Sequence, residues 1–172
     1  MNLQADDFEL FGLPRQFAQD RSAIDARWKA LQREAHPDRF AAQGAAAQRV
    51  AMQWSVRINE AYQRLKDPLR RAAYLCALRG APVEAERNTA MPADFLAEQM
   101  EWREALDDAE GAAALQVLAD RIAEARARRM GALAYALDSA SDAHAAAHEV
   151  RALMFIERFA HDIEMRAEQL GQ

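Results

Sequence analysis

The chain has 172 residues, a formal net charge of −5, and 51% of its residues in the hydrophobic class. Nearly half of that class is alanine, and only eleven residues are valine, isoleucine or threonine, the β-branched types that strands favour. The composition therefore excludes a sizeable sheet and predicts an all-α fold. The longest apolar run, residues 130–137, is too short for a membrane-spanning helix.

The N-terminal eleven residues carry three acids and no base, which fits neither a secretory signal nor a transit peptide, so we expect a cytoplasmic chain. The single cysteine, Cys76, excludes an internal disulfide and a zinc module built on cysteine pairs, and we expect it to be a small buried hydrophobe. Residues 1–75 have a net charge of +3 and residues 76–172 a net charge of −8. This asymmetry indicates two surfaces for two partners; ordinary solvated helix surface is the alternative. The basic half is too sparse to predict nucleic-acid binding.

The first predicted helix is short. Asp6 or Asp7 can cap it, and it ends at residues 12–14, Gly-Leu-Pro. A capping box formed by Ser22 and Asp25 predicts the start of a longer helix, which ends at His36 because the next residue is proline. Its expected core stripe consists of Ile24, Trp28, Leu31 and Ala35.

A short loop to Gln43 or Gly44 leads into a helix over residues 45–66, whose core stripe repeats the same spacing with Trp54, Ile58, Ala61 and Leu65. Two consecutive helices with matching stripes predict an antiparallel hairpin. Pro68 then opens a further helix over residues 69–78.

Glycine and proline cluster between residues 79 and 92, which predicts a linker between an N-terminal domain, 1–78, and a C-terminal domain, 93–172. Beyond the linker, helices are expected over about 93–109, 112–138 and 142–170. Three helices joined by short connections predict a three-helix bundle.

The tripeptide His36-Pro37-Asp38 lies at the turn of the predicted hairpin. Pro37 stiffens the loop, Asp38 offers a carboxylate for bidentate pairing with a partner arginine, and His36 can donate or accept hydrogen bonds. The loop lacks the further groups that catalysis needs, so it indicates a recognition tip; a plain turn is the alternative. In this context the segment resembles the J-domain, the hairpin by which co-chaperones engage ATPases of the DnaK type. The resemblance implies a basic chaperone-binding face beside the tip, formed here by Arg27, Lys29, Arg33 and Arg39.

Residues 94–110 contain seven acids and one base. On a helical wheel one arc forms a core stripe of Phe95, Gln99, Trp102, Leu106 and Ala109. A separate arc holds a second apolar patch ringed by carboxylates, made of Leu96, Met100, Glu101, Glu104 and Asp108. This arc could bind a basic partner with an apolar centre; alternatively, Leu96 and Met100 pack on a neighbouring helix.

Residues 95–106 (FLAEQMEWREAL) look like the signature of the HscB-type J-protein, the co-chaperone of iron–sulfur cluster assembly. The segments FGLP at 11–14, HPDRF at 36–40 and the Pro68 to Leu75 region match the same family in order. The resemblance implies a non-enzymatic co-chaperone without cofactor, whose J-domain stimulates an HscA-type ATPase and whose C-terminal domain binds the scaffold IscU. It implies scaffold contacts at Leu96, Met100, Glu101, Glu104 and Asp108, together with Phe155.

Two alternatives stay open. A general J-domain co-chaperone for unfolded clients would share the tip but not the scaffold surface. A metal-binding protein or small enzyme could be built on His144 and His148, spaced i, i+4, with His161 further along; surface or partly buried histidines are the simpler interpretation. We expect no metal, no nucleic acid and no membrane as partners.

Overall fold

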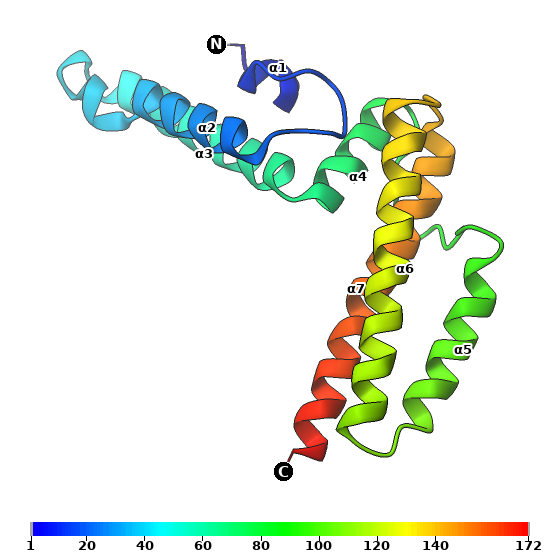
Figure 1. Ribbon diagram of the computed structural model, residues 1–172. Coiled ribbons are helices and arrows are strands. Elements are labelled where there is room, and N and C mark those ends of the chain that lie inside the picture. The colour runs from blue at the N-terminus through cyan, green and yellow to red at the C-terminus, as the bar shows by residue number, and fades with distance from the viewer. Residues whose placement is uncertain (1, 172) are drawn as a thin grey trace. The chain divides into compact units, whose positions relative to one another are not determined.

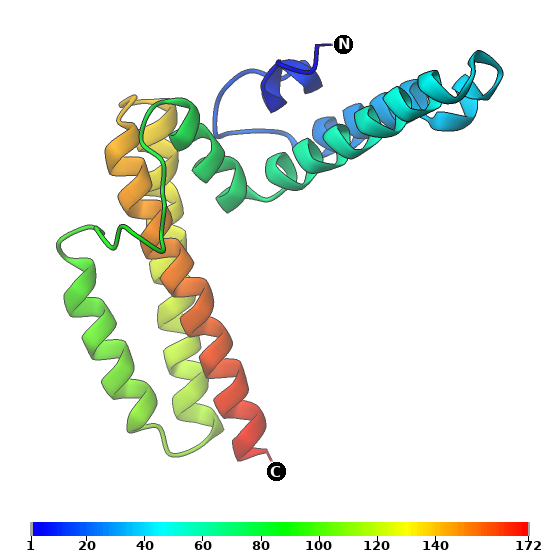
Figure 2. The same ribbon diagram turned by 180° about the vertical axis from the view of Figure 1, so that it is seen from behind.

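The computed structural model describes residues 2–171, which contain seven α-helices, one 3-10 helix and no strand. The all-α prediction is therefore confirmed. The chain divides into two compact units, Met1–Leu75 and Cys76–Gln172 (Figures 1 and 2).

The first unit contains α1 (Asp7–Phe11), α2 (Arg21–Ala35), the 3-10 helix η1 (Pro37–Gln43), α3 (Ala45–Lys66) and most of α4 (Pro68–Leu78). Asp6 caps α1 in a reciprocal capping box with Glu9, and Gly12 ends it in the left-handed conformation with φ +63°. The predicted capping box at Ser22 is wrong. Asp20 lies at the N-cap of α2, and its Oδ1 accepts hydrogen bonds from both the backbone N–H and the hydroxyl of Ser22.

Helices α2 and α3 form the predicted hairpin, and η1 takes the place of the predicted loop between them. Ile24, Leu31 and Ile58 are fully buried between the helices. Trp28 is only half-buried: its ring stacks on Tyr62 with centroids 4.6 Å apart, and its indole N–H donates to Asn59 Oδ1 at 2.9 Å. Indole placed at the edge of the core keeps its polar N–H satisfied.

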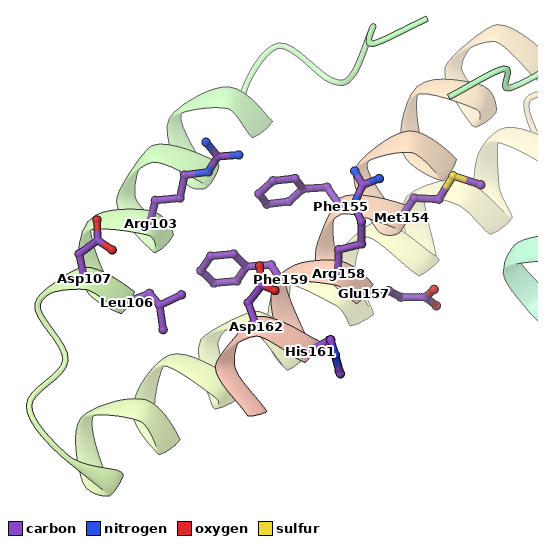
Figure 3. A pocket seen from close by; sticks show the side chains of 10 residues that line it. All are labelled: Arg103, Leu106, Asp107, Met154, Phe155, Glu157, Arg158, Phe159, His161 and Asp162. Atoms are coloured by element: carbon purple, nitrogen blue, oxygen red, sulfur yellow. The ribbon is translucent and has the colours of Figure 1, made fainter. Parts of the chain in front are cut away.

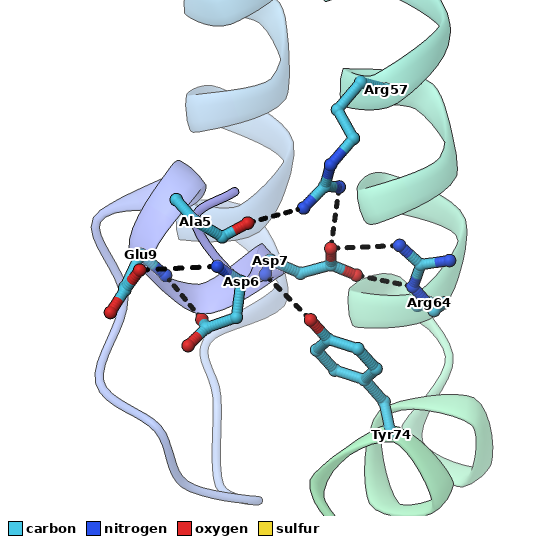
Figure 4. Close-up of polar contacts among 7 residues, drawn as sticks. All are labelled: Ala5, Asp6, Asp7, Glu9, Arg57, Arg64 and Tyr74. Atoms are coloured by element: carbon cyan, nitrogen blue, oxygen red, sulfur yellow. Dashed lines mark hydrogen bonds and ion pairs between the residues drawn. The ribbon is translucent and has the colours of Figure 1, made fainter. Parts of the chain in front are cut away.

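A buried carboxylate ties α1 to the hairpin (Figure 4). The Asp7 side chain is fully buried, and its two oxygens accept hydrogen bonds from Arg57 Nη1 at 2.7 Å and from Arg64 Nε at 2.6 Å. The backbone N–H of Asp7 donates to the Tyr74 hydroxyl at 3.0 Å. Asp7 pairing raises the pKa of the Arg64 guanidinium. This network holds a five-residue helix that is too short to be stable alone.

The second unit contains α5 (Phe95–Asp107), α6 (Ala112–Asp138) and α7 (Ala143–Leu170). Their chain directions alternate, so α5 and α7 run the same way along the bundle and α6 runs against them (Figures 1 and 2). Aromatic rings join α5 to α7: Phe95 lies edge-on to Trp102 and to Phe155, with centroids 5.6 Å apart in each pair.

Buried arginines hold irregular segments to the helices by donating to backbone carbonyls. Arg71 donates to the carbonyls of Phe17 and Leu65 at 2.8 and 2.6 Å. Arg151 donates to those of Val83 and Ala90, both at 2.9 Å. A guanidinium can reach two carbonyls at once, so Arg71 links the Phe17 segment to the last turn of α3, and Arg151 fastens two points of the segment before α5 to α7.

Arg129 of α6 forms ion pairs with three carboxylates of the second unit. Its guanidinium is 2.8 Å from Glu98, 3.2 Å from Asp94 and 3.4 Å from Glu149. Burial raises the pKa of Glu149, while the nearby Arg129 acts in the opposite direction. This network connects all three helices of the bundle.

Candidate functional site

The tip of the hairpin carries the His36-Pro37-Asp38 tripeptide on its surface. The backbone of His36 is extended, with φ −61° and ψ 128°, as expected for a residue before proline. Its Nδ1 accepts a hydrogen bond from the Asp38 backbone N–H at 3.2 Å, so the ring proton of the neutral imidazole is on Nε2. The Asp38 side chain is 92% exposed, and its only neighbour of opposite charge among residues 2–171 is the His36 ring, 3.6 Å away and charged only if protonated. The carboxylate is therefore available to a partner.

The four basic residues expected beside the tip are all exposed. Arg39 follows the tripeptide and donates to the Arg33 carbonyl at 3.2 Å, which fixes it against the end of α2. Arg27 has a structural role as well, because its Nε donates to the Phe11 carbonyl at 3.2 Å. Lys29 and Arg33 form no ion pair within the described residues. The α2 surface thus presents two cations outside any ion pair of the described residues, although Lys29 still acts electrostatically on Asp25 of the same helix.

On α5 the two arcs of the helix separate as the sequence predicts. Phe95 and Trp102 are buried, whereas Leu96 and Met100 are each 64% exposed. The alternative in which Leu96 and Met100 pack on a neighbouring helix is therefore wrong. Around them the carboxylates of Glu101, Glu104 and Asp108 are exposed, and Glu101 lies 3.6 Å from Arg121 of α6. We call Leu96, Met100, Glu101, Glu104 and Asp108 the outer face of α5.

Phe155 does not lie on the outer face of α5. Its side chain is only 9% exposed, because α7 turns it toward the core stripe of α5, where it contacts Phe95. Its ring also stacks with that of Phe159, with centroids 5.9 Å apart, and the Arg103 guanidinium lies over it at 5.5 Å. The structure therefore places five of the six predicted scaffold contacts on one face of α5, and the sixth, Phe155, between α5 and α7.

Phe155 lines a groove between α5 and α7 that has a volume of about 930 Å³ (Figure 3). Its lining comprises Arg103, Leu106, Asp107, Met154, Phe155, Glu157, Arg158, Phe159, His161 and Asp162. On the α5 wheel Arg103 and Asp107 are adjacent to Leu96 and Met100, so the rim of the groove borders the outer face. Sequence reasoning missed the groove, although the repeated spacing of Arg103 and Asp107, and of Arg158 and Asp162, was available as a signal.

The histidine pair finds no support as a metal centre. His144 is exposed and His148 is half-buried, and residues 2–171 contain no group of three or more histidine, cysteine or acidic side chains placed to hold an ion. His161 instead lies 3.8 Å from Glu164. Cys76 is buried as predicted, and burial raises the pKa of its thiol to about 11. Within the described range no helix is long and apolar enough to cross a membrane.

Comparisons with known proteins agree on one family. Residues 91–164 match the family described as "HSCB C-terminal oligomerisation domain". Relatives named "Co-chaperone protein HscB homolog" are 50% identical in Burkholderia multivorans and 51% identical in Burkholderia thailandensis, each alignment covering 99% of this chain and 98% of the relative.

Two solved structures have the same fold. HscB from Vibrio cholerae superposes with a TM-score of 0.79 at 38% identity, covering 96% of this chain and 99% of that one. The human co-chaperone HscB superposes with a TM-score of 0.85 at 26% identity, covering 96% of this chain and 84% of that one. Together with the exposed tripeptide and the outer face of α5, these matches show that the chain belongs to the HscB family of co-chaperones.

Proposed function

We propose that this protein is a non-enzymatic co-chaperone of iron–sulfur cluster biogenesis in the cytoplasm. Its N-terminal domain, 1–78, stimulates the ATPase of an HscA/DnaK-type chaperone. Its C-terminal domain, 93–172, binds an IscU-type scaffold and delivers it to that chaperone, and residues 79–92 are the linker. ATP and the cluster are held by the partners.

The tip supports the chaperone half of the proposal. The Asp38 carboxylate is almost fully exposed and lacks a permanent cation, so it can form a bidentate pair with an arginine of the chaperone. Lys29 and Arg33 supply positive charge on the adjoining helix, which suits an acidic chaperone surface and speeds encounter.

The outer face of α5 supports the scaffold half. Two large apolar side chains that are each 64% exposed lose contact with water only if a partner covers them. The surrounding carboxylates favour a partner with basic residues around an apolar centre. Glu104 and Asp108 are exposed and form no ion pair among residues 2–171. This availability supports their assignment as scaffold contacts.

The observation that carries the proposal is that the exposed tip and the outer face of α5 occur in separate compact units of one chain. Each surface can engage its own partner, and a protein that holds both partners raises the effective concentration of scaffold at the chaperone.

The test is steady-state ATP hydrolysis by the cognate HscA-type chaperone, with this protein and the scaffold added separately and together. We expect synergy that is lost in Asp38→Asn and, independently, in Leu96→Ala/Met100→Ala. Val117→Ala, which changes an equally exposed apolar residue of α6, is the matched control and should retain synergy. Full stimulation by Asp38→Asn would overturn the assignment of the tip. Stimulation independent of scaffold would favour the general co-chaperone.

A further inference from the structure

The groove between α5 and α7 has charged rims that repeat one pattern on both sides. On α5 the rim is Arg103 followed four residues later by Asp107, and on α7 it is Arg158 followed four residues later by Asp162. Because α5 and α7 run in the same direction, the two arginines lie toward one end of the groove and the two aspartates toward the other (Figure 3). One helical turn, about 5.4 Å, separates the two ends.

These four charged groups are not paired with opposite charges within the described residues. An arginine and an aspartate four residues apart on a helix can pair, as Arg21 and Asp25 do at 2.9 Å in the first unit. Within residues 2–171, however, neither Arg103 with Asp107 nor Arg158 with Asp162 forms an ion pair, and none of the four pairs elsewhere. The Arg103 guanidinium lies over the Phe155 ring at 5.5 Å instead.

The floor between the rims is apolar. Phe155 and Phe159 stack side by side along α7, and Leu106 of α5 faces them across the groove (Figure 3). A volume of about 930 Å³ accommodates several side chains of a partner. Because Phe155 and Phe159 are only 9% and 4% exposed, the floor offers a small apolar area. The charged rims would therefore supply most of the contacts and decide which sequence is accepted.

We propose that this groove binds a segment of the scaffold that presents an acidic, an apolar and a basic side chain in that order. The acidic group pairs with Arg103 and Arg158, the apolar group covers Phe155 and Phe159, and the basic group pairs with Asp107 and Asp162. This inference rests on the function proposed above and adds to it the chemistry of the bound segment.

The charge pattern favours such a bipolar segment over simpler ones. A uniformly acidic segment would be attracted by the arginines but repelled by the aspartates, and a uniformly basic one would meet the reverse. A wholly apolar segment would contact the floor but leave all four exposed rim charges without partners. Only a segment with both charges satisfies both ends of the groove.

The test measures the Kd between the purified scaffold and full-length protein by isothermal titration calorimetry. Arg103→Ala/Arg158→Ala and Asp107→Ala/Asp162→Ala should each weaken binding by about tenfold or more, since each removes two charge-assisted contacts. A quadruple variant that exchanges the arginine and aspartate of each rim keeps the net charge but reverses the order, and it should weaken binding further. Glu86→Ala/Arg87→Ala, in an exposed loop of the same unit, is the matched control and should bind normally.

The outcomes separate the two proposals. If the wild-type protein does not bind the scaffold, the proposed function and this inference both fail. If Leu96→Ala/Met100→Ala weakens binding but the three groove variants bind within about twofold of wild type, the function stands and the groove inference is overturned. Tighter binding by Asp107→Ala/Asp162→Ala would show a uniformly acidic segment and would also overturn it. Circular dichroism of each variant verifies that the helices are retained.

Discussion

Replacing Asp7 by asparagine should destabilise the N-terminal unit strongly. The Asp7 side chain is 0% exposed, and its partners Arg57 and Arg64 are 19% and 38% exposed. An asparagine keeps one acceptor oxygen but turns an NH₂ group toward guanidinium donors, and both arginines lose their counter-charge. Removing one partner of a buried ion pair costs about 3–5 kcal/mol. We expect the lower end, about 3 kcal/mol, because Arg64 can still reach water.

For a unit of about 75 residues, 3 kcal/mol corresponds to a decrease in Tm of roughly 12–24 °C. The assay is thermal unfolding followed by tryptophan emission in a Trp102→Phe background, so that the signal comes from Trp28 and Trp54, both in the N-terminal unit. Asp25→Asn is the matched control: Asp25 pairs with Arg21, but its side chain is 37% exposed. A Tm decrease for Asp7→Asn no larger than that of Asp25→Asn would refute the assignment of Asp7 as the tie between α1 and the hairpin.

Three further predictions concern the second unit. Phe95→Ala removes a fully buried ring and should lower the free energy of unfolding by about 3–5 kcal/mol. Leu96→Ala, at the exposed neighbouring residue, should change that free energy by less than about 0.5 kcal/mol. Both are measured by urea denaturation, and equal effects of the two variants would contradict the packing of α5. The pKa of the Cys76 thiol is raised from 9.0 to about 11, so the folded unit holds that proton more tightly than the unfolded chain does. The unit should therefore lose stability as pH rises above about 9, and this loss should be smaller in Cys76→Ala. The same dependence of Tm on pH in both proteins would refute the role of Cys76. Burial raises the pKa of Glu149, so its protonated form stabilises the fold at low pH and this stabilisation is lost as pH rises. Glu149→Gln keeps the side chain neutral and should therefore increase the Tm at pH 7 by a few degrees. A decrease in Tm would show that pairing with Arg129 outweighs burial.

Much of the fold could be predicted because local signals mark the helix ends. Pro37 and Pro68 delimit α2 and α4, and the predicted ranges 45–66 and 112–138 coincide with α3 and α6. The residues of the tip and of the outer face could also be placed on the surface, since helical periodicity determines which side of a single helix is apolar.

Contacts between distant elements could not be predicted in the same way. In the sequence, Asp7 has the features of an acid in the first turn of a helix. No neighbouring residue indicates that it pairs with two arginines that lie 50 and 57 positions later in the chain. The setting of Phe155 depends on how α7 is rotated about its axis and aligned with α5. Both depend on tertiary packing, which periodicity within one helix does not encode.

The preference for arginine has a consequence for regulation. Of the 22 basic residues, 20 are arginines and two are lysines, Lys29 and Lys66. Guanidinium groups keep their charge across the physiological pH range and are not substrates for acetylation. The hydrogen bonds that Arg71 and Arg151 donate to backbone carbonyls are therefore insensitive to acetylation and to pH in the physiological range. On the α2 surface Lys29 is the one basic residue whose charge acetylation can remove, so any acetyl-dependent tuning of this surface has to act there.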